Sequence, residues 1–172
     1  MKKGQRQVTI ALMRNEIEYD AQSILSVIAD TLPSAETAHV KHIYNDICEG
    51  ENARRTIRFA DTAFAVLSEH LHGYTATPIG GDITTDDIAQ TPDVYTLAMQ
   101  MDGDTSSSQV ALIKTLAHDY VVLAIVCGWL ALIGSDRLDY YYAKRDTALA
   151  DAVKAADSHN RIGRVTPFFG NT

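Results

Sequence analysis

The chain has 172 residues, 46% hydrophobic and 22% charged, which suits one globular domain with a sizeable core. Its net charge of -7 disfavours a general nucleic-acid or anionic-membrane binder, because such proteins carry an excess of positive charge. The two cysteines, Cys48 and Cys127, are too few for a disulfide framework, so we expect two buried, reduced thiols. No unbroken apolar run of signal-peptide length follows the basic residues 1–6, which favours an intracellular protein.

The first third of the chain predicts a lead-in and two helices. Residues 7–13 alternate weakly between apolar and polar, which fits either a short strand or the run-in to a helix. A first helix is predicted over 15–32, with Asn15 as its cap, and a second over 34–49, with Ser34 as its cap. Their apolar faces consist of Ile17, Ala21, Ile24 and Ile28 in the first helix and of Val40, Ile43, Tyr44 and Ile47 in the second.

The middle of the chain predicts a third helix, a long loop and a strand. Apolar residues at helical spacing predict a helix over 51–72, with Gly73 as its C-terminal cap. Residues 73–93, rich in Gly, Pro and Asp, predict a loop of unusual length. Alternation over 94–101 predicts a half-buried strand, for which 73–77 is the expected ribbon partner. The helix seam is Ala53, Ile57, Ala60, Phe64, Leu67 and Leu71, and the buried side of the strand is Tyr95, Leu97, Met99 and Met101.

Two further helices are predicted in the last third. The first covers 107–133, and its uncharged run 120–133 is shorter than the roughly 20 residues that a membrane span needs, so we expect a central core helix. The second covers 136–156. The fold class is therefore mainly α: one helical-bundle domain over 1–159, with about five helices and a small β ribbon, followed by an extended C-terminal tail over 160–172.

Two Glu-x-x-His pairs invite a metal hypothesis. Glu36 and His39 fall on the predicted second helix, and Glu69 and His72 end the third. Two such pairs form part of the carboxylate di-metal pattern of four-helix bundles, which also needs a glutamate from each of two more helices. The fourth and fifth predicted helices contain no glutamate, so a solvated polar face is the preferred interpretation and no metal or cofactor is expected.

Three arginines near the start of the third helix are candidate interface residues. Arg54, Arg55 and Arg58 place positive charge near the positive end of the helix dipole, which is unfavourable unless something offsets it. Pairing with Glu51 and Asp61, each one turn away, is the local explanation. The alternative is an acidic surface on a neighbouring subunit.

The tail supplies four more interface candidates. Arg161 and Arg164 precede Phe168 and Phe169 in a polar segment rich in turn formers. Two exposed phenylalanines would be a liability, so they should pack on the chain's own core or on a neighbouring subunit. We expect docking on another subunit in the assembled state, so that deleting 160–172 leaves the helical fold intact and weakens assembly.

Catalytic motifs are missing from the sequence. It contains no Gly-x-Ser-x-Gly nucleophile turn and no phosphate-cradling glycine loop. The expectation is therefore a protein that is not an enzyme.

Several short segments, in their order and spacing, resemble a family of small proteins encoded among the structural genes of prophages in gut bacteria. The segments are Glu16-Ile17-x-Tyr19-Asp20, His39-x-x-His42 with Asp46-Ile47, Asn52-x-x-Arg55-x-x-Arg58-x-x-Asp61-x-Ala63-Phe64, Tyr74-Thr75, His118-x-Tyr120, Trp129-Leu130 and Arg161-x-x-Arg164-x-x-Pro167-Phe168. The resemblance implies a virion or assembly role, most simply a head–tail connector or neck component that forms rings.

The expected partners are accordingly other phage structural proteins and copies of the same chain, without nucleic acid or membrane. The expected location is the host cytoplasm, and the virion if the phage interpretation holds. Two alternatives stay open: a non-viral helical binding or regulatory module, and a metal-dependent helical-bundle enzyme.

Overall fold

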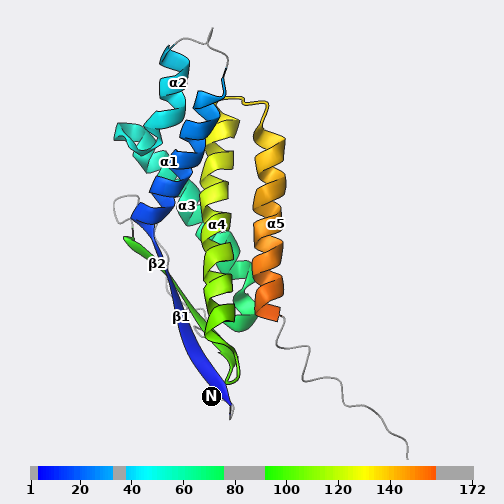
Figure 1. The fold of residues 1–172 in the computed structure, drawn as a ribbon. Helices are drawn as coiled ribbons and strands as arrows, with labels where there is room; N and C mark the ends of the chain where they lie inside the picture. Colours follow the sequence, from blue (N-terminus) through cyan, green and yellow to red (C-terminus); the bar gives the residue numbers. More distant parts are fainter. Residues whose placement is uncertain (1–3, 33–37, 76–91, 158–172) are drawn as a thin grey trace, which may run out of the picture.

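The computed structural model describes residues 4–32, 38–75 and 92–157. Within them the protein is mainly α: five α-helices form one bundle, and two strands form a small antiparallel sheet (Figure 1). In chain order the elements are β1 (Gln5–Met13), α1 (Arg14–Asp30), α2 (Ala38–Asn45), a 3₁₀ turn (Asp46–Cys48), α3 (Gly50–His70), a second 3₁₀ turn (His72–Tyr74), β2 (Val94–Asp102), α4 (Ser107–Leu132) and α5 (Leu138–Asp157). The predicted fold class is confirmed.

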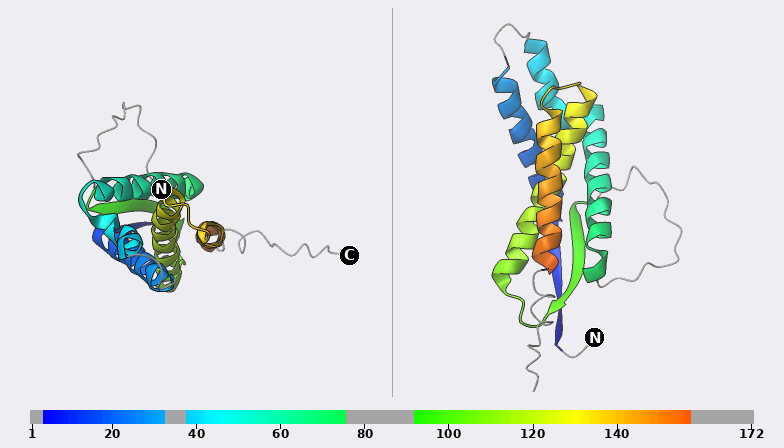
Figure 2. Two further views of the ribbon diagram at one scale, coloured as in Figure 1. Left: turned by 90° about the horizontal axis from the view of Figure 1, so that it is seen from above. Right: turned by 90° about the vertical axis from the view of Figure 1, so that its right-hand side faces the viewer.

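The helix α4 is the centre of the bundle. It packs against α5 on one side and against α1, α3 and β1 on the others (Figures 1 and 2). The run from Tyr120 to Leu130 is largely buried, and Ile125 and Val126 are fully enclosed. Its apolar character on several faces therefore follows from having neighbours on several faces.

The length and composition of α4 are also those of a membrane-crossing helix, and among the described residues it is the one helix with both properties. A core helix and a membrane span share these two properties, so they do not distinguish the two cases.

One prediction about the sheet is wrong, namely the partner of the predicted strand. β2 is the predicted strand, but its partner is β1, the weakly alternating segment at the start of the chain. The two strands pair antiparallel in one continuous register, from Gln5 opposite Asp102 to Met13 opposite Val94. The expected partner segment 73–77 contributes one isolated bridge, Thr75 to Met99, and its residues 76–77 lie outside the described ones.

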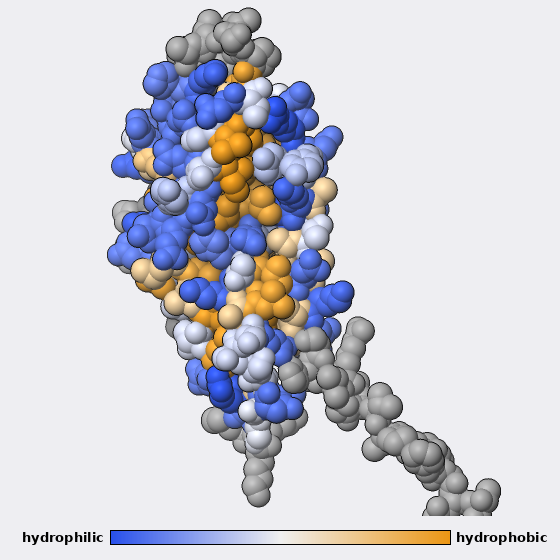
Figure 3. All heavy atoms as spheres, in the orientation of Figure 1, coloured by the Kyte–Doolittle hydropathy of each residue, from blue (hydrophilic) through white to orange (hydrophobic). Residues whose placement is uncertain are grey.

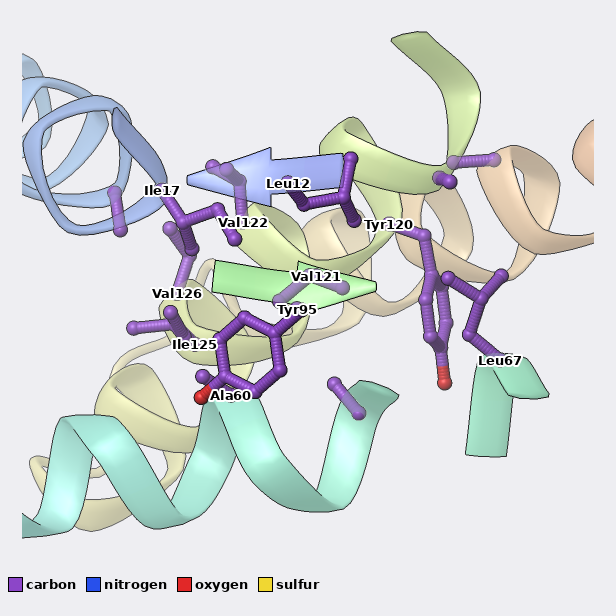
Figure 4. Close-up of a cluster of buried hydrophobic side chains, with 14 of the residues drawn as sticks. Leu12, Ile17, Ala60, Leu67, Tyr95, Tyr120, Val121, Val122, Ile125 and Val126 are labelled. Atoms are coloured by element: carbon purple, nitrogen blue, oxygen red, sulfur yellow. The ribbon is translucent and has the colours of Figure 1, made fainter. Parts of the chain in front are cut away.

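The buried face of the sheet completes the core. Figure 4 shows Leu12 of β1 and Tyr95 of β2 beside Val121 of α4, with the Tyr95 ring directed toward Ala60 of α3. The predicted inward side of β2 is confirmed, because all four of its members are buried: Tyr95, Leu97, Met99 and Met101. The sheet and the helices therefore share one hydrophobic core.

Two helix ends agree with what the sequence predicts, because the serine run that begins at Ser106 predicts the start of α4 and Gly134 predicts its end. The Ser106 side chain accepts a hydrogen bond from the backbone N–H of Gln109 and caps α4. At the other end, Gly134 has φ +65°, and the backbone N–H of Ser135 donates to the Leu130 carbonyl at 3.0 Å. Glycine adopts this left-handed conformation without strain, so it ends the helix cleanly.

Two other predicted caps are wrong. α1 begins at Arg14, directly after β1, so Asn15 lies inside the helix and the cap position belongs to Met13. α3 ends at His70, and Gly73 lies in the following 3₁₀ turn without a positive φ. The predicted cap Ser34 lies outside the described residues. In the first two cases a tertiary connection, to the sheet or to the 3₁₀ turn, decides where the helix ends.

Candidate interaction surfaces

The arginine patch, defined as Arg54, Arg55 and Arg58, lies on the exposed side of α3. The expected local pairing is not present: within the described part of the chain, neither Glu51 nor Asp61 forms an ion pair with these arginines. Arg54 and Arg58 are also one helical turn apart, where like charges repel. The patch therefore presents three cations to solvent, and none of them forms an ion pair within the described part of the chain.

The carboxylate of Asp61 has a different role. Its Oδ1 accepts a hydrogen bond of 2.6 Å from the Tyr95 hydroxyl, which links α3 to β2. Burial, and then this hydrogen bond, raise the pKa of Tyr95 above its ordinary value. The Tyr95 ring lies 5.0 Å from that of Phe64, so this group belongs to the packing between the sheet and α3.

A cleft of about 700 Å³ opens between the first turns of α1 and the first half of α4. At one end, the Nε2 atom of His118 lies 2.9 Å from the Oδ2 atom of Asp20. The phenol of Tyr19 is 72% exposed. The residues that line the cleft are Asn15, Glu16, Tyr19 and Asp20 of α1 and Ala111, Lys114, Thr115 and His118 of α4.

The lining of this α1–α4 cleft combines charged groups with apolar surface. It offers both signs of charge, with Glu16 and Asp20 on one wall and Lys114 on the other. The Thr115 hydroxyl donates to the Ala111 carbonyl of its own helix at 3.1 Å.

A second surface, the α1–α4–α5 groove, lies on the outer side of α4. Its volume is about 360 Å³, and Ile24, Leu116 and Leu123 lie half-buried along its floor. Figure 3 shows apolar surface running over α4, between α1 and α5. The carboxylates of Asp119 and Asp151 stand at its rim.

The described members of the two Glu-x-x-His pairs lie near opposite ends of α3. Glu69 and His72 lie at the C-terminal end of α3, beside a smaller cleft against β2. The backbone of His39 belongs to α2, which precedes the N-terminal end of α3, and the 21 residues of α3 span roughly 30 Å. Glu36 and the His39 side chain lie outside what the structure describes. Among the described residues, no three His, Cys, Asp or Glu side chains gather as metal ligands.

Both cysteines are free, and both thiols are poor nucleophiles. Burial raises the pKa of the Cys127 thiol from 9.0 to about 11, with Arg145 opposing and Asp146 adding to the shift. Burial also raises the pKa of Cys48 to about 11, helped by Glu18 and Glu49. At neutral pH each thiol therefore keeps its proton.

The chain was compared with family models, curated proteins and solved structures. None of them matches it. The candidate surfaces therefore stand on their own geometry.

Sequence reasoning missed both the cleft and the groove. Two features of the sequence could have indicated the cleft. Glu16 and Asp20 lie one turn apart on the polar side of α1, and His118 is a polar residue in the largely apolar α4. The α1 and α4 residues lie about a hundred positions apart in the chain, so whether they meet depends on how α1 packs against α4. The candidate residues Arg161, Arg164, Phe168 and Phe169 lie outside the described residues.

Proposed function

We propose that this chain is a bacteriophage structural protein, a head–tail connector or neck component, that acts by binding other proteins. The segments that resemble prophage structural proteins support this proposal, and so does the exposed surface of the described bundle. The observation that carries the proposal is the arginine patch, three exposed cations without ion-pair partners among the described residues, on a chain whose net charge is -7. Such a patch is complementary to an acidic surface, including that of a second copy.

Charge reversal tests whether the patch is an interface. The triple variant Arg54→Glu, Arg55→Glu, Arg58→Glu should weaken self-association, measured by sedimentation velocity at low and high salt, because attraction to an acidic surface becomes repulsion. The three side chains are exposed, so each reversal should change the free energy of unfolding by no more than about 0.5 kcal/mol. A control reverses two exposed cations elsewhere, Arg6 on β1 and Lys154 on α5, and should associate like the wild type. Equal association of all three proteins contradicts the proposed interface.

The phage assignment itself is tested in particles. Phage particles purified after prophage induction in the bacterium that encodes the chain should contain it, detected by mass spectrometry at several copies per particle. Its absence from such particles contradicts the phage proposal. That result would favour the non-viral binding or regulatory module, for which the α1–α4 cleft supplies a site.

A further inference from the structure

The α1–α4–α5 groove leaves apolar surface uncovered by the described residues. Ile24 comes from α1, Leu116 and Leu123 come from α4, and all three are half-buried. Val122 and Ala148 lie beneath them and are buried. Covering such a floor with another apolar side chain is favourable, at roughly 25 cal/mol for each Å² removed from water.

The rim of the groove carries unpaired negative charge. Asp119 of α4 and Asp151 of α5 are both exposed, and neither forms an ion pair within the described part of the chain. Lys144 also lines the groove, and its ammonium lies 4.7 Å from the centre of the Tyr140 ring. An occupant that suits this surface combines cations with large apolar side chains.

The sequence that follows α5 has this combination. Residues 158–172 include Arg161 and Arg164, and then Phe168 and Phe169, with no acidic residue among them. α5 contributes one wall of the groove and ends at Asp157, six residues after the wall residue Asp151. The Asp157 carboxylate accepts a hydrogen bond from the Tyr74 hydroxyl, which ties this end of α5 to the turn after α3.

We propose that residues 158–172 occupy the groove of their own chain in the isolated protein, with the arginines at Asp119 and Asp151 and the phenylalanine rings on the apolar floor. The lengths agree. Asp151 lies six residues before Asp157, about 9 Å along the helix, whereas four extended residues to Arg161 reach up to about 14 Å. Seven more residues add up to about 24 Å, which carries Phe168 along the whole floor.

The groove is filled by the C-terminal segment of the same chain and not by that of a second copy, because α5 forms one wall of the groove and leads directly into this segment. A short tether gives an effective concentration in the millimolar range, well above that of a second copy in a micromolar solution. In an assembly the identical groove of a neighbouring copy offers the same contacts, so two copies can exchange their C-terminal segments there.

A disulfide-trapping experiment tests the docking. In a full-length chain with Cys48→Ala and Cys127→Ala, the pair Thr147→Cys and Val165→Cys places one thiol on the groove wall and one in the segment, and leaves the arginines and phenylalanines in place. The control pair is Val66→Cys with Val165→Cys, because Val66 is an exposed residue of α3, a helix that does not line the groove. Under mild oxidation, the groove pair should form an intrachain disulfide at least tenfold faster than the control pair. Equal rates overturn the docking, and a disulfide between two chains overturns the own-chain assignment.

Charge reversal then tests the recognition. Asp119→Lys with Asp151→Lys should slow the groove disulfide several-fold, and adding Arg161→Glu with Arg164→Glu should restore it. Reversing Glu51 and Asp136, two exposed acids that do not line the groove, is the matched control and should leave the rate unchanged. A groove variant that reacts as fast as the wild-type background overturns the ion-pair recognition.

Discussion

The single tryptophan, Trp129, connects α4 to α2. Trp129 is 4% exposed, and its Nε1–H donates to the Ile43 carbonyl of α2 at 2.9 Å. Trp129→Ala removes this hydrogen bond and leaves a large cavity, so it should lower the free energy of unfolding by about 3–5 kcal/mol. Urea unfolding followed by circular dichroism measures this loss.

A conservative variant separates packing from the hydrogen bond. Trp129→Phe keeps an aromatic ring but leaves the Ile43 carbonyl without its donor, at a cost of roughly 1–3 kcal/mol. Val27→Ala is the control, because Val27 is 62% exposed and should change the free energy of unfolding by less than about 0.5 kcal/mol. A loss for Trp129→Ala as small as that of the control would mean that the indole is not buried.

The buried thiol of Cys127 should make the protein sensitive to alkaline pH. In the folded chain burial raises the pKa of this thiol from 9.0 to about 11. Between these values an unfolded thiol loses its proton while the folded one keeps it, so the stability this group contributes is complete below about pH 9 and is lost as pH approaches 11. The urea midpoint of the wild type should therefore fall between pH 8.5 and 10.5, and that of Cys127→Ala should fall less.

A double variant serves as the internal check on this pH effect. The pKa of Cys48 is raised to about 11 as well, so adding Cys48→Ala should flatten the profile further. Some loss of stability should remain at the highest pH, because burial also raises the pKa of Tyr95. Identical slopes for the wild type and both variants would contradict the assignment to the thiols.

At the scale of the elements, local sequence patterns predicted whether a segment is a helix or a strand. They were less successful in predicting which other segments it packs against. The strict alternation of β2 was sufficient to identify both the strand and its buried side. Its partner was not predictable in the same way, because β1 lies about ninety residues earlier and its alternation is weaker. β1 and β2 pair because both strands bury their apolar side chains against α3 and α4. A local sequence pattern does not show such tertiary contacts.

The contact between α3 and α4 depends on a glycine. A Cβ atom at Gly128 would lie 2.8 Å from Cγ of Phe59 and 2.9 Å from its Cδ atoms, closer than packed carbons allow. Gly128→Ala should therefore destabilise the protein by roughly 1–3 kcal/mol, even though alanine is the better helix former. Thermal and urea unfolding measure the effect.

In a Phe59→Ala background, the effect of Gly128→Ala on the free energy of unfolding should change sign. Once the ring is removed, Gly128→Ala should stabilise the chain by up to about 1 kcal/mol through helix propensity. Gly73→Ala is the matched control, since a Cβ there meets nothing within 4 Å, and it should be close to neutral. Destabilisation by Gly128→Ala in both backgrounds would show that Phe59 is not the obstacle.

At the scale of the whole molecule, the candidate surfaces were less predictable than the fold. The arginine patch was visible in the sequence because Arg54, Arg55 and Arg58 follow each other on one helix. Whether nearby acids neutralise them was not visible, because Asp61 has a competing partner, Tyr95, on a distant strand. The cleft and the groove exist only where α1, α4 and α5 meet, so they follow from the packing of the bundle.

The apolar helix α4 should stay inside the bundle when lipid is present. A membrane span would expose the apolar side chains of this helix to lipid, but here Ile113, Val121 and Ile125 are fully buried by the rest of the bundle. Insertion would require the bundle to come apart and would bury Lys114 and Asp119, which are exposed. The purified full-length chain should therefore stay at the bottom of a density gradient when mixed with neutral or anionic lipid vesicles. An isolated peptide of residues 107–132 is the positive control, because its apolar surface has no bundle to cover it, and it should float with the vesicles. Flotation of the full-length chain to the same extent would show that α4 leaves the bundle for the bilayer, and the central-helix assignment would then describe only one state of the protein.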